Sequence, residues 1–439
     1  WDEILAFWID DPNVSYEETY NRRNLTDQSS FLYHLILKNF YHLAGYNPEL
    51  GRLVPFFFGI ISIPLLAILS YQIKSDKSFA LTILLVSVNV YLILYSQENR
   101  HYTFIFFLSI INLIYFYKMF FLKKFNYKQG HIYILFIFFS VLGLSEHPFI
   151  LIILFSQVLY SIYYMLIFKK KNYLFFLSVV LILAIYLLLN YKFLTQNLIS
   201  KEYHFVSQLE WNFLYDFFFS RFFGSLIMGL IYLCTLLFLI FNFRKKIFLT
   251  PNKYLLLVFI IIFSYLIPFV YGLYFVPILF DRYIIFILIP ILILLAILLF
   301  EINNIKLRNI ILIFMIAATF FNGYLEIRNK ENTKPEFKNI LNFIKDDDTK
   351  KIAFIVNEGI DDTSLYVVEN YVTSLPIFKE NNLEIFKINN FPDSLNRIWL
   401  ICYEPFTSYN CEMPSHDKWI VKANIKKHLI NARLIEIIN

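Results

Sequence analysis

Long apolar stretches alternate with short polar loops through most of the first 325 residues. A helix needs about 20 apolar residues to cross a bilayer. The longest stretch, 132–168, is interrupted by a polar turn at 145–148 and therefore predicts two helices joined in a hairpin. The pattern predicts about ten membrane-spanning helices, at residues 53–73, 79–96, 102–121, 132–168, 173–190, 224–243, 254–275, 283–300 and 309–324.

The last part of the chain, residues 326–439, has a different pattern. It alternates apolar runs of strand length, rich in β-branched residues, with segments that have helical spacing. We predict a small C-terminal α/β domain, with strands at 351–356, 383–388 and 397–403 and helices at 336–344 and 364–372.

Lysine and arginine gather in every second loop between the apolar stretches. By the positive-inside rule these loops are cytoplasmic, so the net charge of +6 indicates topology rather than nucleic-acid binding. The acidic turns between them then lie on the other side. This predicts a multi-pass plasma (inner) membrane protein of the cell envelope, with an extracytoplasmic loop 1–52, a helical membrane domain 53–325 with an outer loop 191–223, and an extracytoplasmic domain 326–439.

The chain opens within a loop, and we expect a first spanning helix to precede Trp1. His34 and His42 fit an amphipathic helix of the first loop better than a metal site. The tail also contains Cys402 and Cys411, which either form a disulfide or stay as two free thiols.

Composition sharpens the class of protein. Hydrophobic residues make up 58% of the chain and charged residues 16%, more apolar than a soluble core requires. With ten glycines and no P-loop, Gly-rich dinucleotide turn or paired CxxC, the sequence signals no soluble nucleotide-binding fold.

A set of polar residues falls at the predicted outer ends of the helices. Charges beside membrane-length segments are costly and need either partners or a function. Carboxylates suit general-base work on a hydroxyl or amine, and arginines suit a phosphate leaving group. These groups suit the transfer of a sugar from a lipid phosphate to an acceptor: Asp2, Glu3, Asp27, Arg52, Glu98, Arg100, Glu146, His147, Asp281, Arg282 and Tyr283.

Several motifs resemble GT-C glycosyltransferases of the protein mannosyltransferase and aminoarabinose-transferase type. The opening Trp1-Asp2-Glu3 is similar to the acidic pair that follows their first helix. The segments 27–34 and 50–55 resemble their first outer loop, and 95–102 resembles their YSQEAR-Y turn. Ser145-Glu-His147-Pro-Phe resembles their THYF turn, and the segment 281–290 resembles their RYLL…P helix.

The resemblance implies an enzyme that uses a polyprenyl-phosphate sugar donor at the extracytoplasmic face, with a protein, a lipid or a glycan as acceptor. Asp2 would be the catalytic carboxylate, with Glu3 beside it. Glu98 and Arg100 would orient acceptor or donor phosphate. The remaining candidate substrate contacts are Asp27, Arg52, His147, Arg282 and Tyr283.

The sequence departs from this family at Ser29 and Ser30, where a positively charged or metal-capable residue is lacking. No metal ligands are assigned, and dependence on a divalent metal is left open. Each candidate also has a structural interpretation: Asp2 and Glu3 as acids at a helix end, His147 as a turn residue, and ion pairs within Glu98–Arg100 and Asp281–Arg282. The alternative function is a non-enzymatic translocator of lipid-linked sugars, or a transporter.

Overall fold

The computed structural model divides the chain into two compact units. We call residues 1–54 with 327–439 the α/β unit, and residues 55–326 the membrane unit. The first loop and the C-terminal tail, which the sequence pattern treats as separate domains, therefore fall into one unit. The structure describes residues 1–26, 31–121, 130–169, 173–199, 221–248, 253–275, 278, 280–330, 335–356, 362–387, 395–403 and 419–437.

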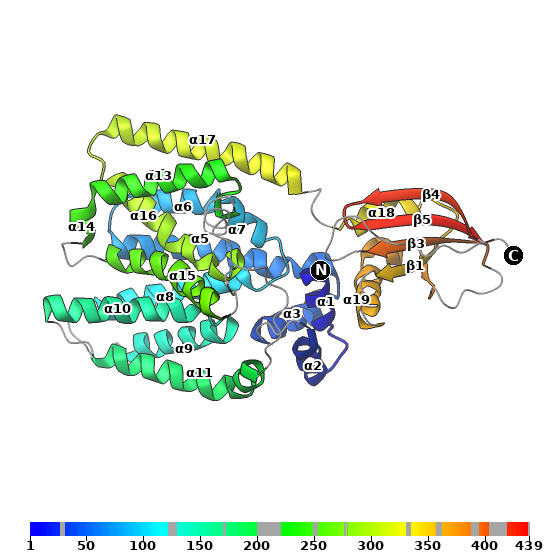
Figure 1. Cartoon of the computed structure of the whole chain (residues 1–439), viewed down its shortest axis with the longest axis horizontal. Helices are drawn as coiled ribbons and strands as arrows, with labels where there is room; N and C mark the ends of the chain where they lie inside the picture. Colours follow the sequence, from blue (N-terminus) through cyan, green and yellow to red (C-terminus); the bar gives the residue numbers. More distant parts are fainter. Residues whose placement is uncertain are drawn as a thin grey trace. The chain divides into compact units, whose positions relative to one another are not determined.

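The membrane unit is built of apolar helices (Figure 1). Seven helices in the described part of the chain are long and apolar enough to cross a membrane, and three further apolar helices are shorter. The protein is thus a multi-pass membrane protein, while ten crossings and their orientation stay predictions. The helices are α5 (Leu53–Ile73), α6 (Ser78–Ser87), α7 (Val90–Tyr95), α8 (Tyr102–Phe120), α9 (Gly130–Glu146), α10 (Ile150–Phe168), α11 (Tyr173–Ile199), α13 (Leu226–Asn242), α14 (Arg244–Phe248), α15 (Tyr254–Tyr274), η3 (Asp281–Ile287), α16 (Leu288–Phe300) and α17 (Ile305–Lys330).

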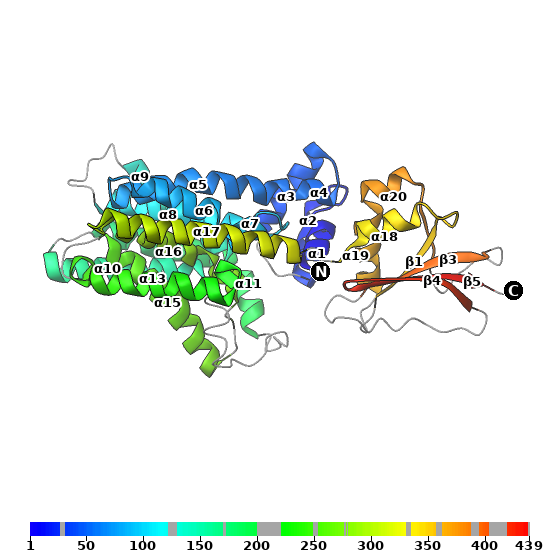
Figure 2. The same cartoon turned by 90° about the horizontal axis from the view of Figure 1, so that it is seen from above.

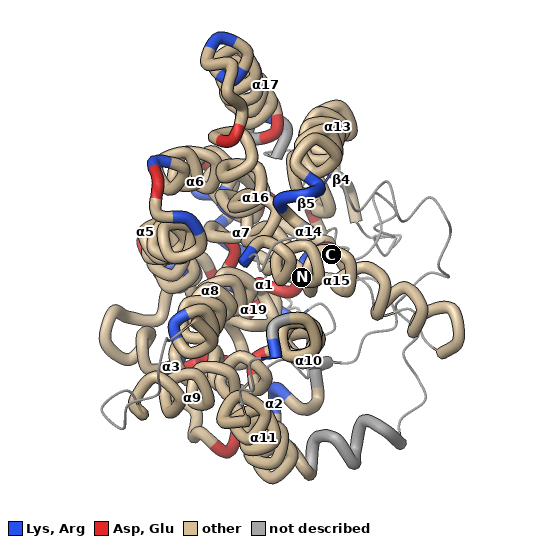
Figure 3. Tube along the Cα trace, turned by 90° about the vertical axis from the view of Figure 1, so that its left-hand side faces the viewer, with Lys and Arg blue, Asp and Glu red and all other residues tan. Residues whose placement is uncertain are grey.

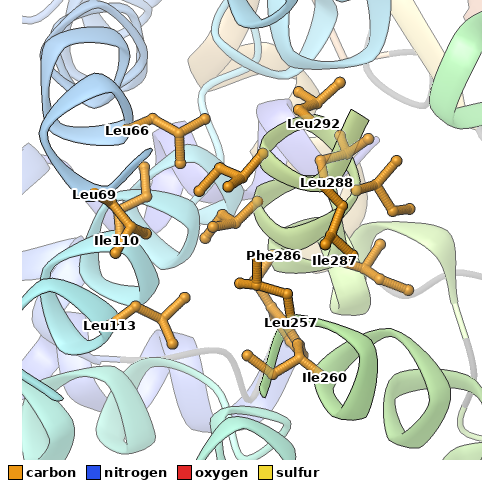
Figure 4. Close-up of a cluster of buried hydrophobic side chains, with 14 of the residues drawn as sticks. Leu66, Leu69, Ile110, Leu113, Leu257, Ile260, Phe286, Ile287, Leu288 and Leu292 are labelled. Atoms are coloured by element: carbon orange, nitrogen blue, oxygen red, sulfur yellow. The ribbon is translucent and has the colours of Figure 1, made fainter. Parts of the chain in front are cut away.

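The segment η3–α16 forms the centre of the membrane unit. The most apolar 18-residue stretch of Asp281–Phe300 is 89% buried. The corresponding stretches of Tyr173–Tyr191 and Ile305–Glu326 are only 22% and 17% buried. Side chains of α5, α8 and α15 converge on η3 and α16 (Figure 4). A helix that is apolar on all sides is stable in the middle of a bundle, whereas α11 and α17 have faces suited to lipid.

The predicted helix 79–96 is interrupted. Its first part, α6, ends at Ser87, and α7 begins at Val90 after a non-helical step. The side chain of Asn89 caps α7 by accepting a hydrogen bond from the Leu92 backbone at 3.0 Å, and it donates to the Phe222 carbonyl at 3.1 Å. Asparagine satisfies the free N–H groups of a helix start, which is why the helix restarts there.

Charged residues of the membrane unit lie mainly near the helix ends (Figure 3). At one such end the carboxylate of Glu301 contacts Lys74 Nζ at 2.8 Å and Lys246 Nζ at 2.6 Å. Lys74 also pairs with Asp76 at 2.7 Å. This network joins the ends of α5 and α16 to α14, the face that the lysine pattern predicts to be cytoplasmic.

The α/β unit contains a five-stranded sheet in the order β2-β1-β3-β5-β4. Strand β1 is parallel to β2 and β3, whereas β5 is antiparallel to β3 and β4. The helices of the C-terminal segment lie on one side of the sheet (Figure 2). The strands are β1 (Lys351–Val356), β2 (Glu384–Ile385), β3 (Arg397–Tyr403), β4 (Trp419–Lys427) and β5 (Ile430–Ile437), and the helices are α18 (Phe337–Ile344), α19 (Asp362–Thr373) and α20 (Pro376–Glu380).

The N-terminal helices complete this unit, as α1 (Asp2–Ile9), α2 (Tyr16–Thr26), α3 (Phe31–Ala44) and α4 (Pro48–Gly51). Apolar residues of α1, among them Leu5 and Trp8, share one buried cluster with α18, α19 and the covered face of the sheet. Tyr46 ties the two segments together, because its hydroxyl contacts the Phe7 carbonyl at 3.0 Å and Asn370 Oδ1 at 2.7 Å. The helix that begins with the acidic pair is therefore part of the α/β core.

Candidate active site

The acidic pair stands at the start of α1. Asp2 and Glu3 occupy the first helical turn, where the positive end of the helix dipole stabilises carboxylates. Glu3 Oε2 lies 3.1 Å from Arg52 Nη2, with 19% and 41% of the two side chains exposed. Both acids thus lie at a helix end, as their structural interpretation states. Glu3 also forms an ion pair with Arg52, another predicted site residue.

Two tyrosines from the C-terminal segment lie beside this pair and were not predicted. Burial raises the pKa of Tyr371 to about 12, and the charge of Glu3 adds to the rise. The Tyr403 ring centroid is 6.3 Å from that of Trp1, and burial raises the pKa of Tyr403, with the neighbouring Tyr371 and Asp2 contributing. Sequence alone gives little signal for them, since 20% of all residues are aromatic.

In the membrane unit, Glu98 and Arg100 lie in the turn between α7 and α8. The Arg100 backbone N–H donates to the Glu98 carbonyl at 2.7 Å, which closes the turn. The Arg100 side chain is buried, and its guanidinium carbon lies 5.7 Å from the centre of the Tyr102 ring.

Arg282 is held by the same ring. Its guanidinium carbon lies 5.8 Å from the Tyr102 centroid, 5.4 Å from that of Phe280 and 5.9 Å from that of Tyr283. One aromatic ring thus lies within cation–π distance of two guanidiniums. Tyr102 was missed as a site residue, although it closes the 95–102 motif. Two arginines gathered in this way suit a phosphate, which guanidinium groups bind through paired hydrogen bonds.

Asp281 is buried and lies 3.6 Å from Arg221, measured from Oδ2 to Nη1. The structural interpretation from the sequence had paired Asp281 with the neighbouring Arg282. Arg221 belongs to the predicted outer loop and was not singled out. The start of that predicted loop was wrong, because residues 191–199 continue α11 (Tyr173–Ile199). Residues 200–220 lie outside the described part of the chain.

His147 follows α9 and turns the chain into α10. Its Nδ1 accepts a hydrogen bond from the Phe149 backbone at 3.2 Å, so a neutral ring carries its proton on Nε2. Burial lowers the pKa of His147 to about 3, which keeps the ring neutral at physiological pH. The ring centroid lies 4.7 Å from Tyr283 and 6.3 Å from His101. His147 thus fulfils the turn role and contacts a second predicted site residue.

Other predictions fall partly or wholly outside the described residues. Asp27 is one of these, as is Cys411, while Cys402 is disulfide-bonded. His34 lies on α3 as expected, with Nδ1 2.7 Å from buried Asp10. Within the described ranges, no three His, Cys, Asp or Glu side chains come together as metal ligands. Metal dependence therefore stays open.

Comparisons with known proteins identify solved structures that share this fold. No protein-family model matches the chain, and no curated protein matches it. Among solved structures it is similar to ArnT from Cupriavidus metallidurans in the apo state, with a TM-score of 0.53 and 10% identity over 92% of this chain and 87% of that one. ArnT bound to undecaprenyl phosphate gives the same TM-score and coverage at 12% identity.

A third structure, an Archaeoglobus fulgidus oligosaccharyltransferase, has a TM-score of 0.48 and 9% identity over 85% of this chain and 59% of that one. The apolar helices and the sheet define the class, a multi-pass helical membrane protein with a small α/β unit. Within that class the likeness to ArnT shows the GT-C fold, as the sequence motifs predicted.

Proposed function

We propose that this protein is a membrane glycosyltransferase that moves a sugar from a polyprenyl-phosphate donor to a protein, lipid or glycan acceptor at the extracytoplasmic face. The observation that carries the proposal is the fold shared with ArnT, a protein whose structure holds undecaprenyl phosphate. The acidic pair on α1 and the two arginines that share the Tyr102 ring support it, because they supply the base and the phosphate ligands that this reaction needs.

In the proposed reaction, Asp2 accepts the proton of the acceptor hydroxyl or amine. The acceptor oxygen or nitrogen then forms a bond to the anomeric carbon while the bond from that carbon to the phosphate oxygen breaks. Direct displacement inverts the anomeric centre. Polyprenyl phosphate leaves with the electron pair, and general-base catalysis of this kind contributes roughly 10²- to 10⁴-fold in rate.

The arginines of the membrane unit stabilise the leaving phosphate. Arg100 and Arg282 both lie within cation–π distance of the Tyr102 ring, and the N–H groups of a guanidinium bind a phosphate through paired hydrogen bonds. Glu3 holds Arg52 in an ion pair, and neutral His147 supplies an Nε2–H donor beside Tyr283. Tyr283 lines the mouth through which the lipid phosphate enters, and Asp27 contacts substrate.

Sidedness and product analysis test the function. The full-length protein is reconstituted in vesicles with a polyprenyl phosphate that carries a radiolabelled sugar, together with candidate acceptors. Label that moves to a new product, with release of polyprenyl phosphate, supports the proposal. Label that crosses the membrane while it stays on the lipid identifies a translocator and overturns it.

A further inference from the structure

The end of the membrane unit that carries α14 has an excess of positive charge. This end faces the viewer in Figure 3, where lysine and arginine are blue. No aspartate or glutamate occurs between Asp216 and Asp281, or between Glu301 and Glu326. We call four cations of these two segments the basic rim: Arg244 and Lys245 of α14, with Lys306 and Arg308 of α17.

The carboxylates at this end are already paired with other lysines. Glu301 contacts Lys74 and Lys246 at 2.8 and 2.6 Å, and Asp76 contacts Lys74 at 2.7 Å. The Lys246–Glu301 pair also brings α14 to the end of α16, from which the chain continues into α17. Within the described ranges, no carboxylate lies at ion-pair distance from any residue of the basic rim. Like charges gathered in this way repel one another, and an anion relieves that repulsion.

The part of the basic rim on α14 lies next to exposed apolar surface. Ile247 is buried in the core of the membrane unit and fixes α14 there, while Arg244 and Lys245 are exposed. The guanidinium carbon of Arg244 lies 4.8 Å from the centre of the Phe241 ring, and Phe241 is 67% exposed. Long basic side chains lay their apolar part along hydrocarbon and keep the charge in water, which suits the boundary of a bilayer.

The part on α17 has the same character. Lys306 is exposed between Ile305 and Leu307, which are 60% and 43% exposed. The guanidinium carbon of Arg308 lies 5.0 Å from the centre of the Phe300 ring, at the last residue of α16. Cations thus alternate with exposed apolar side chains at the start of a helix that is long and apolar enough to cross a membrane.

We propose that the basic rim binds the headgroups of anionic phospholipids in the adjoining leaflet, a role separate from sugar transfer. The lipid phosphate accepts hydrogen bonds from the guanidinium and ammonium groups, and the acyl chains pack against the exposed apolar residues. A soluble anion uses only the cations, whereas a lipid uses both kinds of side chain. The positive-inside rule explains why cations lie on one side of a membrane, but it predicts no preference between bound lipids.

The test compares two lipids that differ in headgroup charge. The full-length protein in detergent is titrated with phosphatidylglycerol and with phosphatidylcholine of the same acyl chains, and bound lipid is counted by native mass spectrometry. The wild type should retain more phosphatidylglycerol, and the difference should shrink as salt is raised. Equal retention of the two lipids by the wild type overturns the proposal.

A double variant of α14 tests the residues. Arg244→Gln with Lys245→Gln should weaken phosphatidylglycerol binding by about 25-fold and leave phosphatidylcholine unchanged, because one cation near an anionic lipid surface contributes about fivefold, or about 1 kcal/mol. Arg244→Lys with Lys245→Arg keeps both charges and should retain the lipid. Unchanged phosphatidylglycerol binding in the glutamine variant contradicts the site.

Two controls separate the site from general charge effects. Lys350→Gln with Lys379→Gln removes the same charge from exposed positions of the α/β unit, and an equal loss of phosphatidylglycerol there overturns the proposal. Inorganic phosphate at the concentration of the lipid should leave the lipid bound, and its displacement would assign the basic rim to soluble anions instead. The proposed reaction uses neither Arg244 nor Lys245, so sugar transfer is measured separately and stands or falls alone.

Discussion

The α/β unit and the membrane unit hold their candidate site residues by different means. In the α/β unit, Glu3 is fixed by an ion pair with Arg52, on a helix whose other face is packed into the sheet core. In the membrane unit, Arg100 and Arg282 are supported by aromatic rings. The ion pair balances the charge of the Glu3 carboxylate, whereas the aromatic contacts bring two guanidiniums from different segments to one ring. The α/β unit thus positions its carboxylate through a charged partner, and the membrane unit gathers its arginines around aromatic rings.

The largest effect is expected when the packing of α1 in the α/β core is weakened. Leu5 is buried in the cluster that joins α1 to the sheet, so Leu5→Ala should lower the free energy of unfolding by about 3 kcal/mol through lost burial and a cavity. Thermal unfolding of the purified protein measures this. Leu25→Ala is the control, because Leu25 is 83% exposed on α2. If both variants unfold at the same temperature, α1 is not part of that core.

The second prediction concerns the aromatic support of Arg282. Arg282→Lys keeps the charge but loses the planar group that contacts Tyr102, Phe280 and Tyr283, and kcat/KM for the lipid donor should fall about 10- to 30-fold. Arg308→Lys is the matched control, since Arg308 lies 5.0 Å from the Phe300 ring centre. Equal activities of the two variants would show that stacking at Arg282 has no special role.

The third prediction uses pH. The pKa of His147 is lowered by burial to about 3 from its ordinary value of 6.5, so between these values the unfolded chain binds a proton that the folded chain does not. Stability should therefore fall as pH drops below 6.5, by about 1 kcal/mol between pH 7.5 and 5.5. His147→Gln should lose this component of the slope. An unchanged slope in His147→Gln would mean that the ring is not held neutral by burial.

The smallest expected effect is at the ion-pair network of the membrane unit. Glu301→Gln removes the charge that faces Lys74 and Lys246, and the free energy of unfolding should fall by about 0.5 to 1 kcal/mol. Because the network is partly exposed, salt should weaken it. A loss that is as large at high salt as at low salt would contradict an electrostatic origin.

The sequence predicted the parts of the fold that depend on local pattern. Most spanning helices were placed from apolar length alone, and the strands 351–356 and 397–403 have the predicted bounds. Strands β4 and β5 were both missed. The β4 segment, Trp419–Lys427, is rich in lysine and lies at the edge of the sheet. The break before α7 was missed because Ser87 and Asn89 are isolated polar residues in an apolar run.

The candidate site shows the same limit. Motifs identified Arg100, Arg282 and His147, which the structure brings together around Tyr102 and Tyr283. The packing of residues 1–54 with residues 327–439 could not be predicted, because contacts between segments so distant in sequence leave no local pattern. The roles of the site residues stay proposals.

Asp2 is the proposed base of the sugar transfer. The most direct test measures transfer of a radiolabelled sugar from polyprenyl phosphate by wild type and Asp2→Asn, with binding of polyprenyl phosphate measured in parallel. Glu49→Gln is the control, because Glu49 pairs with Lys338 at the surface of the same unit. Asp2→Asn should keep its fold and bind the lipid normally but lose transfer by at least about 100-fold. Near-normal transfer by Asp2→Asn would contradict it.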